Sequence, residues 1–242
     1  MPRHIEYVAE TGSTNADLAE RLTSGGDVAE GHWLVADRQI AGKGRQGRAW
    51  LDAPGNFAGS TVVRLAPQDP PAATLSFVAA LAVYETVVAR LAQPQRLQLK
   101  WPNDLLLDGG KVCGILLERE GEYAIVGIGV NLAAAPPQAT GRKVQSLSLH
   151  GPAPERDAFA QALATSFAAE LARWRRYGTG PLFTRWLAAA HPPGSTLRVH
   201  DDRSAPLHGT FAGLQEDGAL RLRLEDGSTR VIHAGDVQLG AG

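Results

Sequence analysis

The sequence predicts an α+β fold in two parts, a larger domain over residues 1–190 and a small β-barrel over residues 191–242. Two observations lead to this prediction. Segments with helical spacing alternate with strand-like segments in the first part, and only short strand-like segments separated by turns follow. The length of 242 residues also suits one sizeable hydrophobic core with a smaller one beside it.

Four segments have the apolar spacing of an amphipathic helix. The first starts after Thr11-Gly12, where Ser13 or Thr14 can serve as N-cap, and Gly25-Gly26 ends it. The second repeats apolar residues at intervals of three and four from Leu75 onwards. The predicted helices cover residues 13–22, 74–91, 155–175 and 181–190.

Strands are predicted where short apolar or β-branched runs lie between glycine and proline clusters. The cluster at 67–71 ends one such run, and Pro102 favours an extended residue before it. The predicted strands of the first part cover residues 32–39, 56–65, 97–101, 111–118 and 123–132. Residues 42–54, which contain several glycines, and the proline-rich residues 133–138 are predicted to be loops.

His191-Pro192-Pro193-Gly194 is the predicted domain boundary. Beyond it, Asp217-Gly218 and Asp226-Gly227 are strong hairpin signals. The predicted strands here cover residues 196–199, 207–214, 219–224 and 228–232. Four or five strands in about 48 residues favour a barrel, because closing a small sheet removes its unpaired edges.

Composition excludes several classes of protein. The chain has 24 Lys and Arg, 25 Asp and Glu, and a formal net charge of −1, so it cannot hold nucleic acid or an anionic membrane by bulk positive charge. A single cysteine, Cys113, cannot form an internal disulfide and is interpreted as a core residue. The N-terminus lacks the apolar core of a secretory signal, and no apolar stretch reaches the ~20 residues of a membrane helix. A cytoplasmic protein is therefore expected.

Residues 42–48 place three cations, Lys43, Arg45 and Arg48, among three glycines without an acidic residue. Glycine lets a backbone come close to a ligand, and the cations supply charge for a nucleotide phosphate or a carboxylate. The segment matches G-x-G-x-x-G, but a dinucleotide fingerprint needs a helix opening at its last glycine. Pro54 and Gly55 follow too soon for that helix. The alternative interpretation is a solvated basic turn.

Polar residues also follow the predicted strands. Asn103 and Asp104 come just after Trp101-Pro102, where ligand groups commonly sit at a strand end, although an Asx turn would have the same sequence. Lys111 begins a largely apolar strand, and simple alternation places Lys111 with Cys113 on one face and Gly114 on the other. The strand that ends at Asn131 contains glycines that would admit a flat ligand.

Taken in order, these motifs resemble the biotin–protein ligases (biotin–[acetyl-CoA-carboxylase] ligases). The similarity runs through residues 12–15, 37–50, 100–104, 111–118 and 127–131, and thus through the whole predicted first domain. The resemblance implies a mixed sheet flanked by helices, like that of class II synthetases and biotin–lipoate ligases. It also implies an SH3-like barrel at the C-terminus.

The resemblance also implies the site residues by position. Biotin would be bound by Ser13, Thr14, Asn15, Gln39, Gly42, Lys43, Gly44, Arg45, Lys111 and Gly114. ATP would be bound by Arg48, Trp50, Asn103, Asp104 and Asn131, with Trp50 packed against adenine. The expected catalytic residues are Arg45, Lys111 and Asp104, of which Asp104 would orient or deprotonate the incoming lysine. No metal ligand is assigned.

The implied reaction forms biotinyl-5′-AMP from biotin and ATP, with Mg²⁺ as the expected ion, and then transfers biotin to a lysine. The acceptor would be the biotin carboxyl carrier protein of acetyl-CoA carboxylase, and a homodimer is possible through an exposed strand. The first motif begins at Gly12, so neither a DNA-binding domain nor repressor function is expected. Position 43 is Lys where many members have Arg. Residues 236–242 lack the basic residue that some members have there, which argues against an ATP contact from this domain.

Three alternatives differ in chemistry. A lipoate or octanoate ligase would need an apolar slot, whereas Ser13, Asn15 and Gln39 offer polar partners. A nucleic-acid-binding regulator would use arginines of the C-terminal strands, yet Phe211 is the only aromatic residue after Trp186. A biotin-binding module without catalysis would not need the residues on the nucleotide side.

Overall fold

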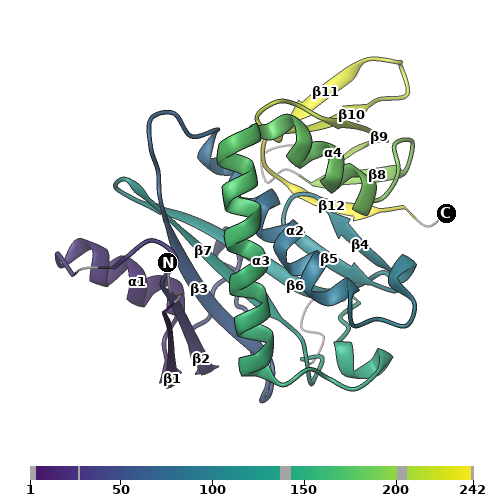
Figure 1. Cartoon of the computed structure of the whole chain (residues 1–242). Helices are drawn as coiled ribbons and strands as arrows, with labels where there is room; N and C mark the ends of the chain where they lie inside the picture. The colour runs from purple at the N-terminus through teal and green to yellow at the C-terminus, as the bar shows by residue number, and fades with distance from the viewer. Residues whose placement is uncertain (1–3, 27, 137–142, 201–205, 241–242) are drawn as a thin grey trace.

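The computed structural model describes residues 4–26, 28–136, 143–200 and 206–240. Its first domain is built on a seven-stranded mixed sheet in the order β1-β2-β3-β7-β6-β5-β4 (Figure 1). β1 runs parallel to β2, and the other neighbouring strands pair antiparallel. The strands are β1 (Ile5–Thr11), β2 (Trp33–Gln39), β3 (Phe57–Arg64), β4 (Leu97–Lys100), β5 (Asp104–Leu107), β6 (Gly110–Glu120) and β7 (Tyr123–Val130). The mixed sheet expected from the sequence is confirmed.

Helices pack on both faces of this sheet, but unequally. α2 (Leu75–Val88) and α3 (Arg156–Tyr177) cover one face, where Val126, Ile128 and Val130 of β7 enter the main core (Figure 1). α1 (Thr14–Thr23) packs through Leu18 on a separate small core with Ile125. Because side chains alternate along a strand, the glycines of β7 face away from the main core. That face is left open for a site.

The C-terminal domain is a five-stranded antiparallel sheet in the order β11-β10-β9-β8-β12. The last helix before it, α4 (Thr179–Ala189), ends just ahead of the proposed division at residues 190 and 191. The Trp101 indole N–H donates to the Gly218 carbonyl at 3.0 Å and so joins the two domains. The strands are β8 (Thr196–His200), β9 (Leu207–Leu214), β10 (Leu220–Arg223), β11 (Thr229–Ile232) and β12 (Asp236–Leu239).

Each predicted helix and strand is present with bounds shifted by at most a few residues, and part of the predicted loop at 133–138 lies outside the described residues. Three strands were not predicted. β1 is an edge strand whose apolar residues are interrupted by Glu6 and Glu10, and β5 and β12 have only four residues each. No described helix is long and apolar enough to cross a membrane.

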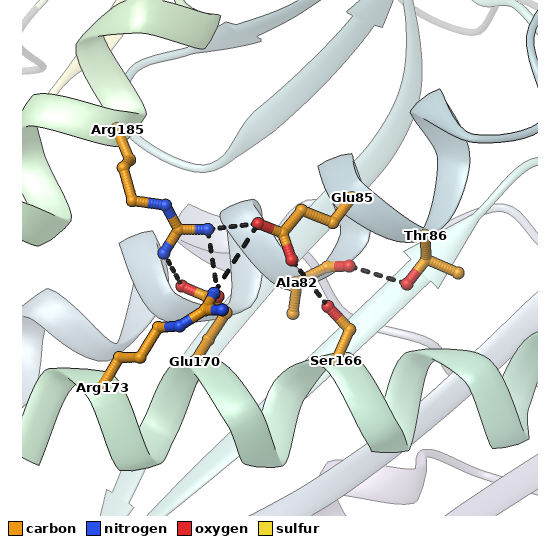
Figure 2. A network of polar contacts seen from close by, with 7 residues as sticks. All are labelled: Ala82, Glu85, Thr86, Ser166, Glu170, Arg173 and Arg185. Atoms are coloured by element: carbon orange, nitrogen blue, oxygen red, sulfur yellow. Dashed lines mark hydrogen bonds and ion pairs between the residues drawn. The ribbon is translucent and has the colours of Figure 1, made fainter.

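Three helices are joined by an ionic network around one buried carboxylate (Figure 2). Glu170 of α3 is 1% exposed, and both Arg173 and Arg185 approach its carboxylate at 2.5 Å. Arg185 of α4 also contacts Glu85 of α2. The arginines are partly exposed, but loss of both would leave the buried Glu170 carboxylate without a partner, which is strongly destabilising. The network therefore fixes the layer of helices that supports the sheet from behind.

A buried histidine lies at the junction of the two domains. His191 is 3% exposed and packs against Phe211, with the two rings tilted by 56° and their centroids 4.7 Å apart. The pKa of His191 is lowered to about 4, chiefly by burial and also by the Lys100 ammonium, while the nearby backbone of Leu99 acts in the opposite direction. The ring is thus neutral in the folded protein at neutral pH.

We expect this histidine to make the protein less stable in mild acid. Below about pH 6.5 the unfolded chain binds a proton on His191 that the folded chain does not bind until about pH 4. The free energy of unfolding should therefore fall by roughly 2–3 kcal/mol between pH 7 and 4.5 through this group alone. Urea unfolding of wild type and His191→Phe across this range measures the difference. His208→Gln, at an exposed position, is the control, and parallel pH profiles for wild type and His191→Phe would contradict the expectation.

Candidate active site

A cavity of about 320 Å³ lies on the open face of the large sheet, where β6 and β7 contribute Gly114, Gly127 and Gly129. Asp236 of the C-terminal domain also borders it. Of the fifteen residues predicted for the site, fourteen line this cavity: Ser13, Thr14, Asn15, Gln39, Lys43, Gly44, Arg45, Arg48, Trp50, Asn103, Asp104, Lys111, Gly114 and Asn131. Gly42 lies directly behind the lining, where its carbonyl accepts a hydrogen bond from the Trp50 N–H at 2.8 Å.

One end of the cavity is polar and uncharged. Ser13 is the N-cap of α1, but its side chain makes no capping hydrogen bond. The Thr14 N–H donates to Gln39 Oε1 at 2.8 Å, and the Thr14 hydroxyl lies 2.6 Å from that of Ser60. The start of α1 is therefore joined to β2 and β3 through hydroxyl and amide groups. Ser60 was not predicted, because a single serine in an apolar strand carries no distinctive signal.

The glycines of β7 make room for two side chains. A Cβ at Gly127 would lie 2.3 Å from Asn15 Oδ1, and one at Gly129 would lie 2.3 Å from two atoms of the Trp50 indole. The indole also passes within 3.0 Å of the position that a Cβ at Gly114 would occupy. The sequence suggested that these glycines admit a flat ligand. In the structure, the close approach is made by Asn15 and Trp50.

Residues 42–50 form a tight antiparallel turn over the cavity. Lys43 pairs with Ala49, and the Gly44 N–H donates to the Arg48 carbonyl at 2.6 Å. A single 3₁₀ turn (Arg45–Gly47) closes the segment, with Gln46 and Gly47 in the left-handed region. No α-helix begins at Gly47, so the segment lacks the helix of a dinucleotide fingerprint.

At the opposite end, two lysines enclose a buried carboxylate. Asp104 is 7% exposed, with Lys111 Nζ 2.6 Å from its Oδ1 and Lys100 Nζ 2.9 Å from its Oδ2. Burial alone would raise the pKa of Asp104, but the two ammonium groups outweigh it and hold the pKa well below its usual range. Lys100 also donates to the Val237 carbonyl at 3.0 Å. Lys100 was not assigned a role from the sequence, although it lies four residues before Asp104.

The prediction that Lys111 shares a face of β6 with Cys113 was wrong. β5 pairs Leu105 with Cys113 and Leu106 with Lys111, so Val112 is an extra residue in β6. This β-bulge resets the alternation and brings Lys111 to the same face as Gly114, whose Cβ would meet Lys111 Nζ at 2.9 Å. Cys113 stays in the core, where burial raises the pKa of its thiol, as expected for a residue without nucleophilic function.

The C-terminal domain meets the turn at 42–50. Arg48 Nη1 lies 3.4 Å from Asp236 Oδ2, and Arg45 Nη1 lies 3.5 Å from the Gly235 carbonyl. Burial lowers the pKa of Arg45, and the nearby Asp104 carboxylate opposes this effect. The sequence indicated only that residues 236–242 lack a basic residue. In the structure, an acidic residue of this tail, Asp236, borders the cavity.

The two asparagines predicted for the nucleotide side bind backbone groups. Asn103 Nδ2 donates to the Ile115 carbonyl at 2.5 Å, and Asn131 Nδ2 donates to the Gln145 carbonyl at 3.0 Å. Among the described residues, no group of three or more His, Cys, Asp or Glu is placed to hold a metal ion. The cavity therefore combines an uncharged polar end with four cations and two carboxylates, which suits a small polar molecule next to a polyanion.

Comparison with known proteins identifies the family of the chain. Residues 10–131 match the model of the biotin/lipoate A/B protein ligase family, and residues 196–240 match the C-terminal domain of biotin protein ligases. The chain belongs to the biotin/lipoate A/B protein ligase family. It is 42% identical to the biotin–[acetyl-CoA-carboxylase] ligase of Paracoccus denitrificans, over 96% of this chain and 99% of that protein.

Two solved structures are similar over nearly all of the chain. The biotin protein ligase of Aquifex aeolicus in complex with biotin and ATP has a TM-score of 0.85 and 25% identity, with each chain fully covered. The biotin protein ligase of Leishmania major in complex with biotinyl-5-AMP has a TM-score of 0.68 and 25% identity, covering 97% of this chain and all of that one. The expected fold class is thus confirmed.

We expect Gly129→Ala to expel the Trp50 indole from its place on the sheet, because the new methyl group would overlap the ring. The other four tryptophans are at most 2% exposed, so a red shift of emission and greater quenching by acrylamide would report on Trp50. Gly180→Ala, where a Cβ meets nothing within 4 Å, is the control. An emission spectrum of Gly129→Ala identical to that of wild type would contradict the described position of the ring.

Proposed function

We propose that this protein activates biotin with ATP and transfers it to a lysine of the biotin carboxyl carrier protein of acetyl-CoA carboxylase. The observation that carries the proposal is the cavity itself, which joins an uncharged polar end to a cluster of cations within one space. Membership of the family and the 42% identity to a biotin–[acetyl-CoA-carboxylase] ligase support it.

The polar end would bind the fused rings of biotin. Thr14, Asn15 and Ser60 offer oxygen atoms that can accept hydrogen bonds from the N–H groups of a cyclic urea, and the Ser13 hydroxyl, which makes no capping hydrogen bond, can donate to its carbonyl. Gln39, next to Thr14, would lie beside the valeryl chain, and the backbone at Gly42, Gly44 and Gly114 would leave room for it. The dithiolane ring of lipoate has no N–H or carbonyl group. Lipoate would therefore leave the polar groups at this end of the cavity unpaired, which opposes its binding.

The cationic end would bind ATP and the biotin carboxylate. Trp50 is proposed to pack against adenine, while Arg48, Asn103 and Asn131 would lie on the nucleotide side. A carboxylate oxygen attacks the α-phosphorus, a mixed anhydride forms and pyrophosphate leaves. Lys43, Arg45 and Lys111 would neutralise the negative charge that accumulates in this step, which is commonly the largest catalytic contribution.

In the second step, the neutral amine of the acceptor lysine attacks the acyl carbon, and AMP leaves. Asp104 was expected to orient or deprotonate this amine. A general base works best with a pKa near the working pH, whereas the pKa of Asp104 is held well below its usual range. We therefore assign to Asp104 the positioning of the Lys111 ammonium, 2.6 Å away, rather than proton abstraction.

Mg²⁺ would enter with ATP as part of the substrate. Asp104 is already paired with two lysines, and Asp236 with Arg48, so the described carboxylates of the cavity form no metal cage. Mg²⁺ usually keeps several waters and binds through substrate phosphates. A homodimer through an exposed strand stays a possibility; the sheet edges are β1 and β4 in the first domain, where Leu99 of β4 already bridges Ala190, and β11 and β12 in the second.

Exchange of labelled pyrophosphate into ATP tests the proposed function. With the purified chain, ATP and Mg²⁺, we expect exchange only when biotin is present. Lipoate and octanoate are the controls for the related ligases. Exchange driven by lipoate but not by biotin, or no exchange with any acid, would contradict the proposal.

Lys111→Met should nearly abolish the first step. Removing one cation that stabilises the transition state typically costs about 3–4 kcal/mol, so the exchange rate should fall roughly 10²- to 10³-fold. Biotin binding, measured by calorimetry, should weaken far less. Lys143→Met is the matched control, because Lys143 is an exposed lysine that binds the Asp108 carbonyl. A normal exchange rate with Lys111→Met would remove Lys111 from the mechanism.

A further inference from the structure

A chain of hydrogen bonds leads from the polar end of the cavity to a carboxylate outside it. The Thr14 hydroxyl lies 2.6 Å from Ser60 Oγ, and the Ser60 hydroxyl donates to Asn15 Oδ1 at 2.6 Å. Asn15 Nδ2 then donates to Glu118 Oε2 at 2.6 Å. Thr14, Asn15 and Ser60 are each at most 5% exposed, whereas Glu118 is exposed and does not line the cavity.

The sheet brings Glu118 to this place. Glu118 and Leu116 lie on the same face of β6, and Leu116 pairs with Gly127 of β7. The Asn15 side chain lies over Gly127, where a Cβ would be 2.3 Å from its Oδ1. A residue larger than glycine at position 127 would push Asn15 out of line between Ser60 and Glu118.

The Glu118 carboxylate fixes the direction of each hydrogen bond between Glu118 and Thr14. An ionised carboxylate only accepts hydrogen bonds, so the NH₂ group of Asn15 must face Glu118 and its oxygen must face Ser60. Ser60 uses its one proton on that oxygen. Thr14 must then donate its proton to Ser60, 2.6 Å away, rather than to Gln39 Oε1 at 3.1 Å.

We propose that Glu118 is a positioning residue that sets the polarity of the biotin-binding end. With the protons of Thr14 and Ser60 committed to their neighbours, their oxygens present lone pairs to the cavity, as does Asn15 Oδ1. Such a wall selects a ligand with N–H donors, and the urea of biotin has two of them. This inference rests on the proposed function and concerns the substrate group that the site selects.

The test compares Glu118→Ala and Glu118→Gln in pyrophosphate exchange with biotin, desthiobiotin and a biotin methylated on a urea nitrogen. Desthiobiotin keeps the urea and lacks the sulfur. For Glu118→Ala we expect the KM of biotin and of desthiobiotin to rise about 10-fold, because one charge-assisted hydrogen bond is lost. The KM of ATP and kcat should stay within about twofold. Glu118→Gln, whose amide oxygen can still accept from Asn15, should recover most of the affinity.

The methylated analogue separates positioning from a general structural effect. It lacks one N–H, so it should bind wild type poorly, and Glu118→Ala should weaken it much less than it weakens biotin. Glu120→Ala, the next carboxylate on the same face of β6, is the matched control and should change nothing. The thermal midpoint of each variant shows that it folds.

Three results would overturn the inference: an unchanged KM for biotin in Glu118→Ala, an equal loss for all three ligands, or an equal loss in Glu120→Ala. These results differ from a failure of the proposed function. In that case wild type itself would show no biotin-dependent exchange, whereas an active wild type with an indifferent Glu118→Ala would remove only the role of Glu118.

Discussion

The site depends on one buried carboxylate with two lysines. Asp104 begins β5, Lys100 ends β4 and Lys111 lies on β6, so the ionic cluster joins three neighbouring strands. Lys100 extends the cluster to the Val237 carbonyl of the C-terminal domain. A buried charge is tolerated only with good partners, and loss of one typically costs several kcal/mol. The position of Lys111 in the cavity and the seating of the small domain are therefore set by the same group.

The rest of the cavity depends on two positions of β7 that lack side chains. Gly127 and Gly129 alternate with apolar residues that pack under α2 and α3, so a single strand serves the core with one face and the site with the other. The space above the two glycines is taken by Asn15 from α1 and Trp50 from the turn at 42–50. In this way β7 positions one residue for each end of the cavity.

Most of the fold and of the site could be predicted because both depend on local signals. Helical spacing, glycine clusters and Asp-Gly turns located the main elements, and motifs in sequence order located fourteen residues that line the cavity. What could not be predicted depends on pairing across the sheet. β5 is too short to show a pattern, Ser60 resembles any strand hydroxyl, and the contact between Arg48 and Asp236 joins residues 188 positions apart.

The extra residue in β6 sets the register with β5 and thereby the face of the sheet on which Lys111 lies. Val112 has no counterpart in β5, and it alone puts the ammonium of Lys111 on the side of Gly114 instead of Cys113. If Val112 instead paired regularly with Leu106, strict alternation would turn the lysine toward Cys113 and the apolar layer beneath the helices. The cation proposed to act on the substrates would then be buried in the core, although every amino acid of the motif remained in place.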